Sequence, residues 1–232
     1  MKLILKFGGT SLASPKDINN VAKTVASFSK DNEIVVVCSA VDGVTDDLLL
    51  ISKMIEQRKK DDVTEALNKI IKKHRNLADQ TIKNSAIKKQ LIEKLDGDIS
   101  ELQELIRGLT LLKEVSARSL DYLISFGERL SDDLVSYTLQ DLKKKSTALN
   151  GQEVGIVTDS NFGESRPLMD TTRIRISKTL GSLLSEKIIP VVGGFAGADQ
   201  HGNITTFGRG GSDYTATIIA SCINADEVWL MS

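Results

Sequence analysis

Two glycine-rich turns, one near each end of the chain, carry residues that could bind an anion. Residues 6–11 read KFGGTS and residues 208–213 read GRGGSD, so Lys6 and Arg209 each lie beside consecutive glycines. Glycines let backbone N–H groups approach a phosphate or a carboxylate closely, and a neighbouring cation strengthens the attraction. The turns therefore predict phosphate or carboxylate binding. The turn at 6–11 has neither the spacing of a Walker A loop nor that of a GxGxxG dinucleotide fingerprint.

The second turn runs into a helix of small apolar residues. Ser212 is expected to cap this helix, and Asp213 falls in its first turn, where a negative charge is favoured. Arg209 can hold a carboxylate with two parallel hydrogen bonds. An ordinary glycine turn before a capped helix would show the same residues, so this stretch alone leaves both interpretations open.

Strand-like runs precede the glycine turns. The expected strands are residues 2–7, 34–38, 146–149, 188–195 and 227–230, and the expected helices include 15–29, 117–140 and 170–185. Because the turns at 8–9, 193–194 and 208–211 follow strands, we expect them to meet at one edge of a mainly parallel sheet. The predicted fold class is α/β, a three-layer sandwich with a mainly parallel sheet flanked by helices.

Residues 46–115 are strongly helical and highly charged, and we interpret them as a helical insertion in a single domain of residues 1–232. Apolar residues spaced by three and four predict two helices that form an antiparallel hairpin, with the break at Asn84 and Ser85. His74 lies on the apolar stripe of its helix, so we interpret it as a packing residue. Ser116 is expected to cap the next helix.

Hydroxyl and carboxylate groups outside the glycine turns give weaker signals. Ser39 and Thr45 follow an expected strand and can donate to an anionic ligand, although such hydroxyls more often cap helices or stabilise turns. Ser125, Glu128 and Ser131 recur every three residues along one ridge of the helix 117–140. Glu128 alone would be interpreted as a solvated carboxylate.

Composition limits the classes of partner. The net charge is -1, from 30 basic and 31 acidic residues, which argues against nucleic acid or an anionic membrane as a partner. Cys38 and Cys222 lie in apolar segments and are expected to be buried free thiols in a reducing cytoplasm. The sequence has no zinc-ligand spacing, no apolar run of membrane-spanning length and no signal-peptide pattern.

Four motifs, in order, resemble those of aspartate kinases in the amino-acid kinase superfamily. They are KFGGTS at 6–11, VCSA at 37–40, SFGERLS at 125–131 and GRGGSD at 208–213, and the similarity covers essentially the whole chain. Met231 and Ser232 stand where the family has a Thr-Asp pair leading into a nucleotide-binding segment. We therefore expect a catalytic domain truncated at its nucleotide-binding end, without the family's regulatory domains.

The resemblance implies transfer of the ATP γ-phosphoryl group to the side-chain carboxylate of L-aspartate, with Mg²⁺. The product is 4-phospho-L-aspartate, and the reaction is the first step of lysine, threonine and methionine biosynthesis. Lys6 and Asp213 would be catalytic, with Lys6 neutralising the phosphoryl group and Asp213 orienting Lys6 or organising Mg²⁺. The implied phosphate contacts are Lys6, Gly8, Gly9, Ser11, Gly210 and Gly211. The implied aspartate contacts are Ser39, Thr45, Glu128, Arg209, Gly210, Gly211 and Ser212.

Two alternatives stay open. The chain could be a non-catalytic fragment or subunit that binds aspartate without a complete ATP site. It could also be a sister kinase acting on glutamate, acetylglutamate, carbamate or uridine monophosphate, although the motif at 125–131 resembles aspartate kinases specifically. The resemblance further implies a homodimer that pairs through helices.

Overall fold

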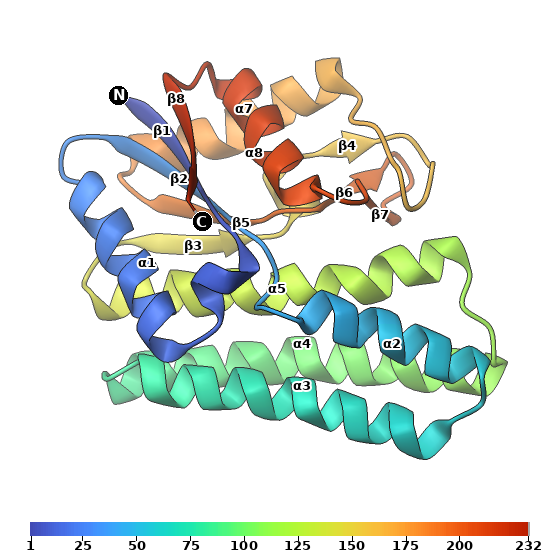
Figure 1. Cartoon of the computed structure of the whole chain (residues 1–232). Helices are drawn as coiled ribbons and strands as arrows, with labels where there is room; N and C mark the ends of the chain where they lie inside the picture. Colours follow the sequence, from blue (N-terminus) through green and yellow to red (C-terminus); the bar gives the residue numbers. More distant parts are fainter. Residues whose placement is uncertain (232) are drawn as a thin grey trace.

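A five-stranded parallel sheet forms the centre of the computed structural model, which describes residues 1–231 (Figure 1). Its strands, in spatial order, are β3 (Ser146–Leu149), β5 (Ile189–Gly193), β2 (Glu33–Cys38), β1 (Lys2–Phe7) and β8 (Glu227–Met231). β2 is an apolar run and is buried over its last five residues, as expected for a strand covered on both faces. The parallel sheet predicted from the apolar runs is confirmed.

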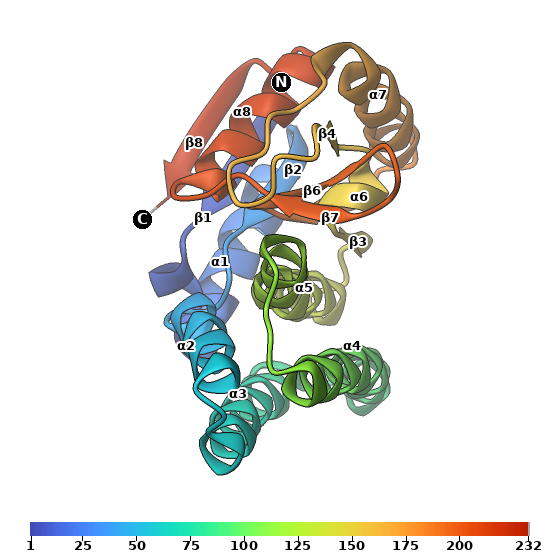
Figure 2. The ribbon, with the colours of Figure 1, turned by 90° about the vertical axis from the view of Figure 1, so that its right-hand side faces the viewer.

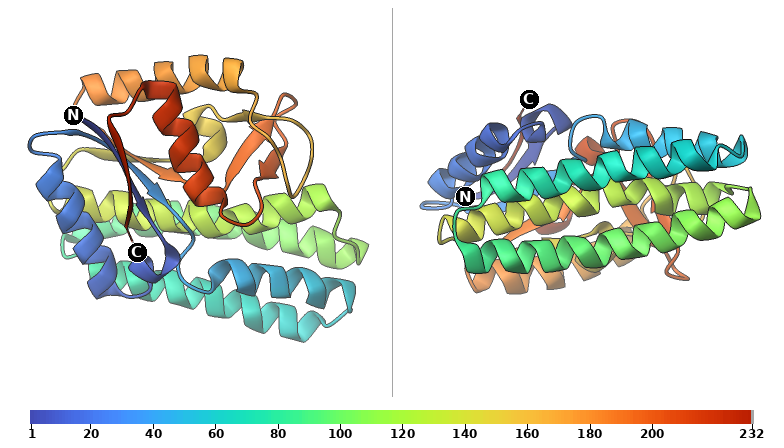
Figure 3. Two further views of the ribbon diagram at one scale, coloured as in Figure 1. Left: turned by 45° about the horizontal axis from the view of Figure 1, so that its top comes forward. Right: turned by 90° about the horizontal axis from the view of Figure 1, so that it is seen from below.

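Helices cover both faces of this sheet. α1 (Pro15–Phe28) and α5 (Ala117–Asp141) pack on one face, and α7 (Met169–Ser185) and α8 (Gly211–Ile223) pack on the other (Figures 1 and 3). Alternate residues of β1 supply the two cores, because successive side chains of a strand point to opposite faces. Leu5 packs in the core with α1 and α5, whereas Ile4 packs with α7 and α8. The predicted three-layer sandwich is therefore confirmed.

The charged segment at 46–115 contains three helices rather than two. α2 (Val44–Glu56) precedes the predicted hairpin, which α3 (Lys60–Thr81) and α4 (Ser85–Leu112) form. The hairpin packs beneath α2 and α5, on the side away from the sheet (Figures 2 and 3). The Asn84 side chain accepts hydrogen bonds from the first backbone amides of α4, and Ser116 caps α5 in the same way. Both predicted helix starts are confirmed.

A second, three-stranded sheet was not predicted. It contains β4 (Val157–Thr158), β6 (Ala196–Asp199) and β7 (Ile204–Thr206), with the short helix α6 (Gly151–Val154) beside it. β6 and β7 form an antiparallel hairpin, and the Asp199 carboxylate holds its turn by accepting from the amides of His201 and Asn203 at 2.9 Å each. His201 is exposed at this turn.

The predictions for histidine and cysteine packing are also confirmed. His74 is fully buried, and its Nδ1 atom lies 2.8 Å from the carbonyl oxygen of Ile70. Burial lowers the His74 pKa to about 4, so this ring is neutral near pH 7. Cys38 and Cys222 are buried free thiols. Within residues 1–231, no helix has the length and apolarity needed to cross a bilayer.

Candidate active site

The carboxyl ends of β1, β2 and β5 meet at one edge of the large sheet, as predicted. The amide of Ser39, just after β2, donates to the carbonyl of Phe7 at 3.0 Å, and the amide of Gly194, just after β5, donates to the carbonyl of Cys38 at 2.9 Å. These bonds place three strand-to-loop turns side by side. Edges of this kind are the usual ligand sites of open α/β sheets.

The glycine turn at 208–213 reaches the same edge and starts α8. The helix begins at Gly211, and its N-cap is Gly210, whose φ of 77° is left-handed. Ser212 therefore lies inside the first turn, and its predicted capping role is wrong, because glycine adopts the left-handed entry conformation at little cost. Residues 211–213 consequently present the amino end of a helix toward the site.

An ion pair joins the two glycine turns. Lys6 Nζ, at the end of β1, lies 2.7 Å from Asp213 Oδ1, in the first turn of α8. The Lys6 side chain is 15% exposed and that of Asp213 is 50% exposed, so the pair lies at the mouth of the site. Gly8 and Gly9 follow Lys6 after one residue, Phe7, and Ser11 lies in the short 3₁₀ helix Gly9–Leu12. The structure therefore brings the predicted phosphate-binding residues into one region.

Gly194 allows the turn after β5 to touch the start of α8. A Cβ atom at Gly194 would lie 2.8 Å from the Cβ and 2.9 Å from the Cα of Ser212. Next to it, Phe195 has a φ of 72°, and its amide donates to Thr215 Oγ1 at 3.0 Å. A positive φ is rare for a bulky aromatic residue, which shows how tightly this turn is held against α8.

We expect the substitution Gly194→Ala to destabilise the protein by about 1–3 kcal/mol, because the start of α8 must move to admit the methyl group. Thermal unfolding should show a lower Tm. Gly97→Ala is the matched control: Gly97 lies within α4 with nothing within 4 Å of its added Cβ, and alanine should raise the Tm slightly. An unchanged or raised Tm for Gly194→Ala would contradict the close contact.

Glu128 is buried at this edge, contrary to its interpretation from the helix pattern alone as a solvated carboxylate. Its Oε1 atom accepts from the Ala40 amide at 3.2 Å, and its Oε2 atom is buried with no hydrogen-bond partner among residues 1–231. Desolvation by burial raises the Glu128 pKa from its ordinary value of 4.5 to about 8. An unpartnered buried carboxylate oxygen is costly, so Glu128 is well suited to receive a cationic donor.

The small residue before Glu128 explains how the loop after β2 reaches α5. A Cβ at Gly127 would lie 2.9 Å from the Cβ of Ala40 and 3.6 Å from Thr45 Oγ1. Ser131, one turn after Glu128, donates from its Oγ atom to the Ser39 carbonyl at 2.7 Å. Ser39 and Thr45 therefore both lie close to the part of α5 that carries Glu128, as predicted.

Arg209 differs from the other predicted residues. It lies in the exposed part of the loop before α8, and it forms no ion pair within the part of the chain that the structure describes. Its guanidinium is thus free for a ligand at the entrance of the site, and its predicted contact with a carboxylate stays a prediction.

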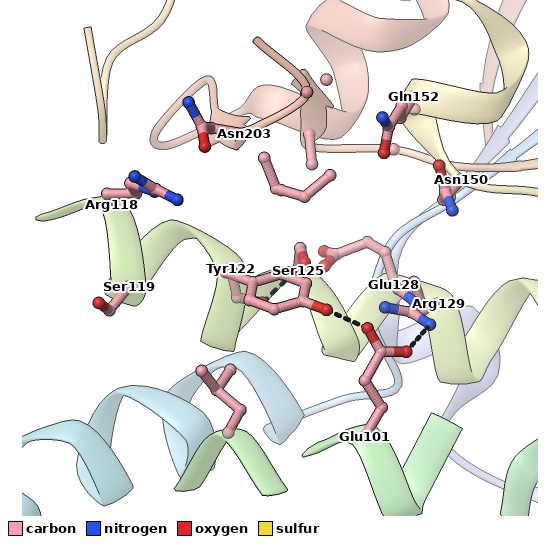
Figure 4. Close-up of a pocket in the computed structure, with 18 of the residues that line it drawn as sticks. Glu101, Arg118, Ser119, Tyr122, Ser125, Glu128, Arg129, Asn150, Gln152 and Asn203 are labelled. Carbon is pink, nitrogen blue, oxygen red and sulfur yellow. Dashed lines mark hydrogen bonds and ion pairs between the residues drawn. The ribbon is translucent and has the colours of Figure 1, made fainter. Parts of the chain in front are cut away.

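A cavity of about 620 Å³ borders Glu128, between α5, α4 and the β6–β7 hairpin (Figure 4). Glu101 on α4 accepts from Tyr122 and from Arg129, the latter at 2.7 Å, and Arg129 also donates to Asp98 at 2.6 Å. The Arg129 guanidinium lies 4.5 Å from the centre of the Phe126 ring. Sequence reasoning missed this network, because its partners come from two helices about thirty residues apart in the chain.

A comparison with models of protein families shows to which family the chain belongs. The model of the amino acid kinase family matches residues 1–232. The chain belongs to this family. Among curated proteins it is similar to Aspartokinase 3, chloroplastic, of Arabidopsis thaliana, with 35% identity over 97% of this chain and 39% of that protein. It is also similar to the aspartokinase of Geobacillus stearothermophilus, with 30% identity over 97% of this chain and 40% of that protein.

A solved structure agrees with this assignment. The structure of E. coli aspartokinase III in complex with aspartate and ADP superposes with a TM-score of 0.87 and 26% identity, over 98% of this chain and 48% of that one. The chain thus covers between 39% and 48% of the length of these relatives. The predicted family and fold are confirmed.

Proposed function

We propose that this chain is the catalytic domain of an aspartate kinase, which binds L-aspartate and ATP and forms 4-phospho-L-aspartate. The observation that carries the proposal is the buried, unpartnered Oε2 atom of Glu128 at the sheet edge that also holds the Lys6–Asp213 pair. An amino-acid substrate supplies the ammonium group that this oxygen lacks. The similarity to E. coli aspartokinase III, solved with aspartate and ADP, supports this choice of substrate.

The head group of aspartate would bind between α5 and the loop before α8. Glu128 would accept a hydrogen bond from the α-ammonium group, and Arg209 would hold the α-carboxylate through its two parallel N–H groups. Ser39, Thr45 and Ser212 would add hydroxyl donors around the substrate. This arrangement leaves the side-chain carboxylate directed toward the glycine turns.

Phosphoryl transfer would occur between these turns. A side-chain carboxylate oxygen of aspartate attacks the γ-phosphorus of ATP, the bond from that phosphorus to the bridging oxygen breaks, and ADP leaves with the bond electrons. The carboxylate is already ionised at pH 7, so no general base is needed. The chain's contribution is charge stabilisation by Lys6 and by the backbone amides at 8–9 and 210–211, assisted by Ser11.

The residues fit a magnesium ion that is held mainly by the nucleotide. Residues 1–231 contain no group of three or more His, Cys, Asp or Glu side chains placed to bind a metal ion. Mg²⁺ commonly uses one or two carboxylates together with substrate phosphates, and the half-exposed Asp213 is the carboxylate beside the phosphate-binding turns. Bound Mg²⁺ would neutralise phosphate charge, while Asp213 orients Lys6.

The direct test is aspartate-dependent ADP formation by this chain with Mg-ATP. We expect ADP formation with L-aspartate and none above background with L-glutamate, acetylglutamate, carbamate or uridine monophosphate. Calorimetric titration with L-aspartate should accompany the assay. Binding without turnover would instead support a non-catalytic aspartate-binding unit, and absence of both would contradict the proposal. A cytoplasmic location and a homodimer paired through helices stay predictions.

A further inference from the structure

Asp121 is a buried carboxylate on α5 that the proposed chemistry does not use. It lies two helical turns before Glu128 and is 1% exposed. Its Oδ2 atom accepts from the amides of Gly163 and Thr206, at 2.9 and 2.8 Å, and its Oδ1 atom accepts from Thr206 Oγ1 at 2.8 Å. No Lys, Arg or His within residues 1–231 forms an ion pair with it. Three hydrogen bonds thus satisfy this charge.

These bonds hold the start of the loop 208–210 against α5. Thr206 ends β7 and precedes Gly208 by two residues, and its carbonyl accepts from both the amide and the Oγ of Ser165 at 2.9 Å. Gly163 supports the loop from below, because a Cβ on Gly208 would lie 3.0 Å from the Gly163 carbonyl oxygen. Asp121 therefore joins the start of the loop 208–210 and the segment beneath it to one helix. Figure 2 shows β7 lying above α5.

The same helix carries Glu128, so α5 fixes the position of both ends of the proposed aspartate site. One end is Glu128 itself, and the other is Arg209, in the loop that Asp121 anchors. Glu128 is fixed within the helix, whereas Arg209 lies three residues beyond the Thr206 anchor, in an exposed part of the loop. On the far side, the loop is held by α8, which begins at Gly211. The separation between Glu128 and Arg209 thus depends on where Thr206 is fixed relative to α5.

We propose that Asp121 is a positioning residue that sets the length of the substrate site by holding Thr206 and Gly163 against α5. This inference rests on the proposed aspartate kinase function. The head group of aspartate would span Glu128 and Arg209, and the phosphoryl acceptor oxygen would then reach a fixed distance into the glycine turns. A loop that moves away from α5 admits the extra methylene of glutamate and holds aspartate less well.

The carboxylate suits this role because all three of its partners are donors. An asparagine has one acceptor oxygen and one donor NH₂ group. Asp121→Asn therefore either places N–H against the amides of Gly163 and Thr206, or keeps all three contacts as weaker neutral hydrogen bonds in which the Thr206 hydroxyl accepts instead of donating. Misplacing a substrate-positioning group by about 1 Å can reduce the rate by about a hundredfold. Loss of the Asp121 contacts should therefore affect substrate length discrimination as well as affinity.

The experiment compares Asp121→Asn with Asp141→Asn. Asp141 ends α5 and also accepts two backbone amides, from Lys83 at 3.1 Å and Asn84 at 2.9 Å, but it supports the start of α4 rather than the loop at 208–210. We expect Asp121→Asn to raise the KM and Kd for L-aspartate about tenfold, and to form ADP with L-glutamate above the background of the unsubstituted chain. Asp141→Asn should lower the Tm while leaving these values unchanged.

Hydrogen exchange separates failure of this inference from failure of the proposed function. The Gly163 and Thr206 amides should exchange faster in Asp121→Asn than in the unsubstituted chain, whether or not the chain turns over aspartate. Unchanged exchange would overturn the anchoring role. Faster exchange with an unchanged aspartate KM and no ADP formation with L-glutamate would show that Asp121 acts on stability alone, which also overturns the proposal. An unsubstituted chain that neither binds nor phosphorylates aspartate would overturn the proposed function and, with it, the specificity role of Asp121.

Discussion

The substitution Lys6→Met should lower aspartate-dependent turnover by about two to three orders of magnitude, the loss typical when one preorganised electrostatic donor is removed from a phosphoryl or acyl transfer site. Lys6 supplies positive charge at the end of β1, beside the backbone amides of Gly8 and Gly9. The transferring phosphoryl group carries charge on its equatorial oxygens, so a fixed cation there stabilises the transition state. Methionine keeps an unbranched apolar stem of similar length but removes the charge.

The fold should survive this substitution. The ion pair with Asp213 lies at the mouth of the site, with Asp213 half exposed, and pairs of this kind contribute at most about 1 kcal/mol to stability. The mainly buried stem of Lys6 is preserved by methionine. The Tm should therefore change by only a few degrees, and the loss should appear in kcat at saturating Mg-ATP and aspartate.

Lys2→Met provides a control on the same strand. Lys2 begins β1, at the opposite end from the glycine turn, so loss of its charge should leave turnover within about twofold of the unsubstituted value. If Lys6→Met retained near-normal turnover, Lys6 would have no part in the transfer step. If Lys2→Met lost as much activity as Lys6→Met, net charge rather than local geometry would explain the effect.

The local sequence was sufficient to predict the sheet and the glycine turns. The β-branched run of β2 and the strand-turn-helix pattern at the start of the chain follow from side-chain periodicity and capping residues, which are local properties. The convergence of the turns follows from a general property of parallel sheets. These features depend little on contacts between distant segments.

The features that the sequence did not predict depend on distant contacts or on backbone conformation. Glu128 is buried because Ala40, 88 residues earlier, packs against Gly127. The residue pattern of the helix alone cannot predict a contact with such a distant segment. The N-cap of α8 is Gly210 rather than Ser212, because the sign of φ at a glycine is not determined by its neighbours. β4 has two residues and β6 reads AGAD, so neither carries the β-branched signal of a strand.

The substitution Glu128→Gln should raise the KM for L-aspartate by about 10- to 100-fold, since it replaces a charge-assisted hydrogen bond to the ammonium group with a neutral one. The KM for ATP should change little, because Glu128 lies on α5, whereas the proposed phosphate contacts lie in the glycine turns. Initial rates over both substrates measure the two constants. Equal effects on both would argue against the amino-group role.

Aspartate binding should also depend on pH through Glu128. Burial raises the Glu128 pKa to about 8, so the unliganded side chain is mostly protonated at pH 7, whereas the substrate ammonium group requires the carboxylate form. Binding must therefore release a proton. Affinity should rise nearly tenfold between pH 6 and pH 7 and level off above pH 8, over the range in which the substrate ammonium group stays protonated.

The raised Glu128 pKa also makes the stability of the unliganded fold depend on pH. A carboxyl group whose pKa rises from 4.5 to about 8 on folding contributes stability that is fully present below pH 4.5 and is lost as the pH rises through about 8. Glu128→Gln should abolish both this loss and the pH dependence of aspartate binding. Glu101→Gln is the control, because the hydrogen bond from Arg129 lowers the Glu101 pKa and keeps that carboxylate ionised throughout the range. A pH dependence that persisted in Glu128→Gln would assign the titrating group to another residue.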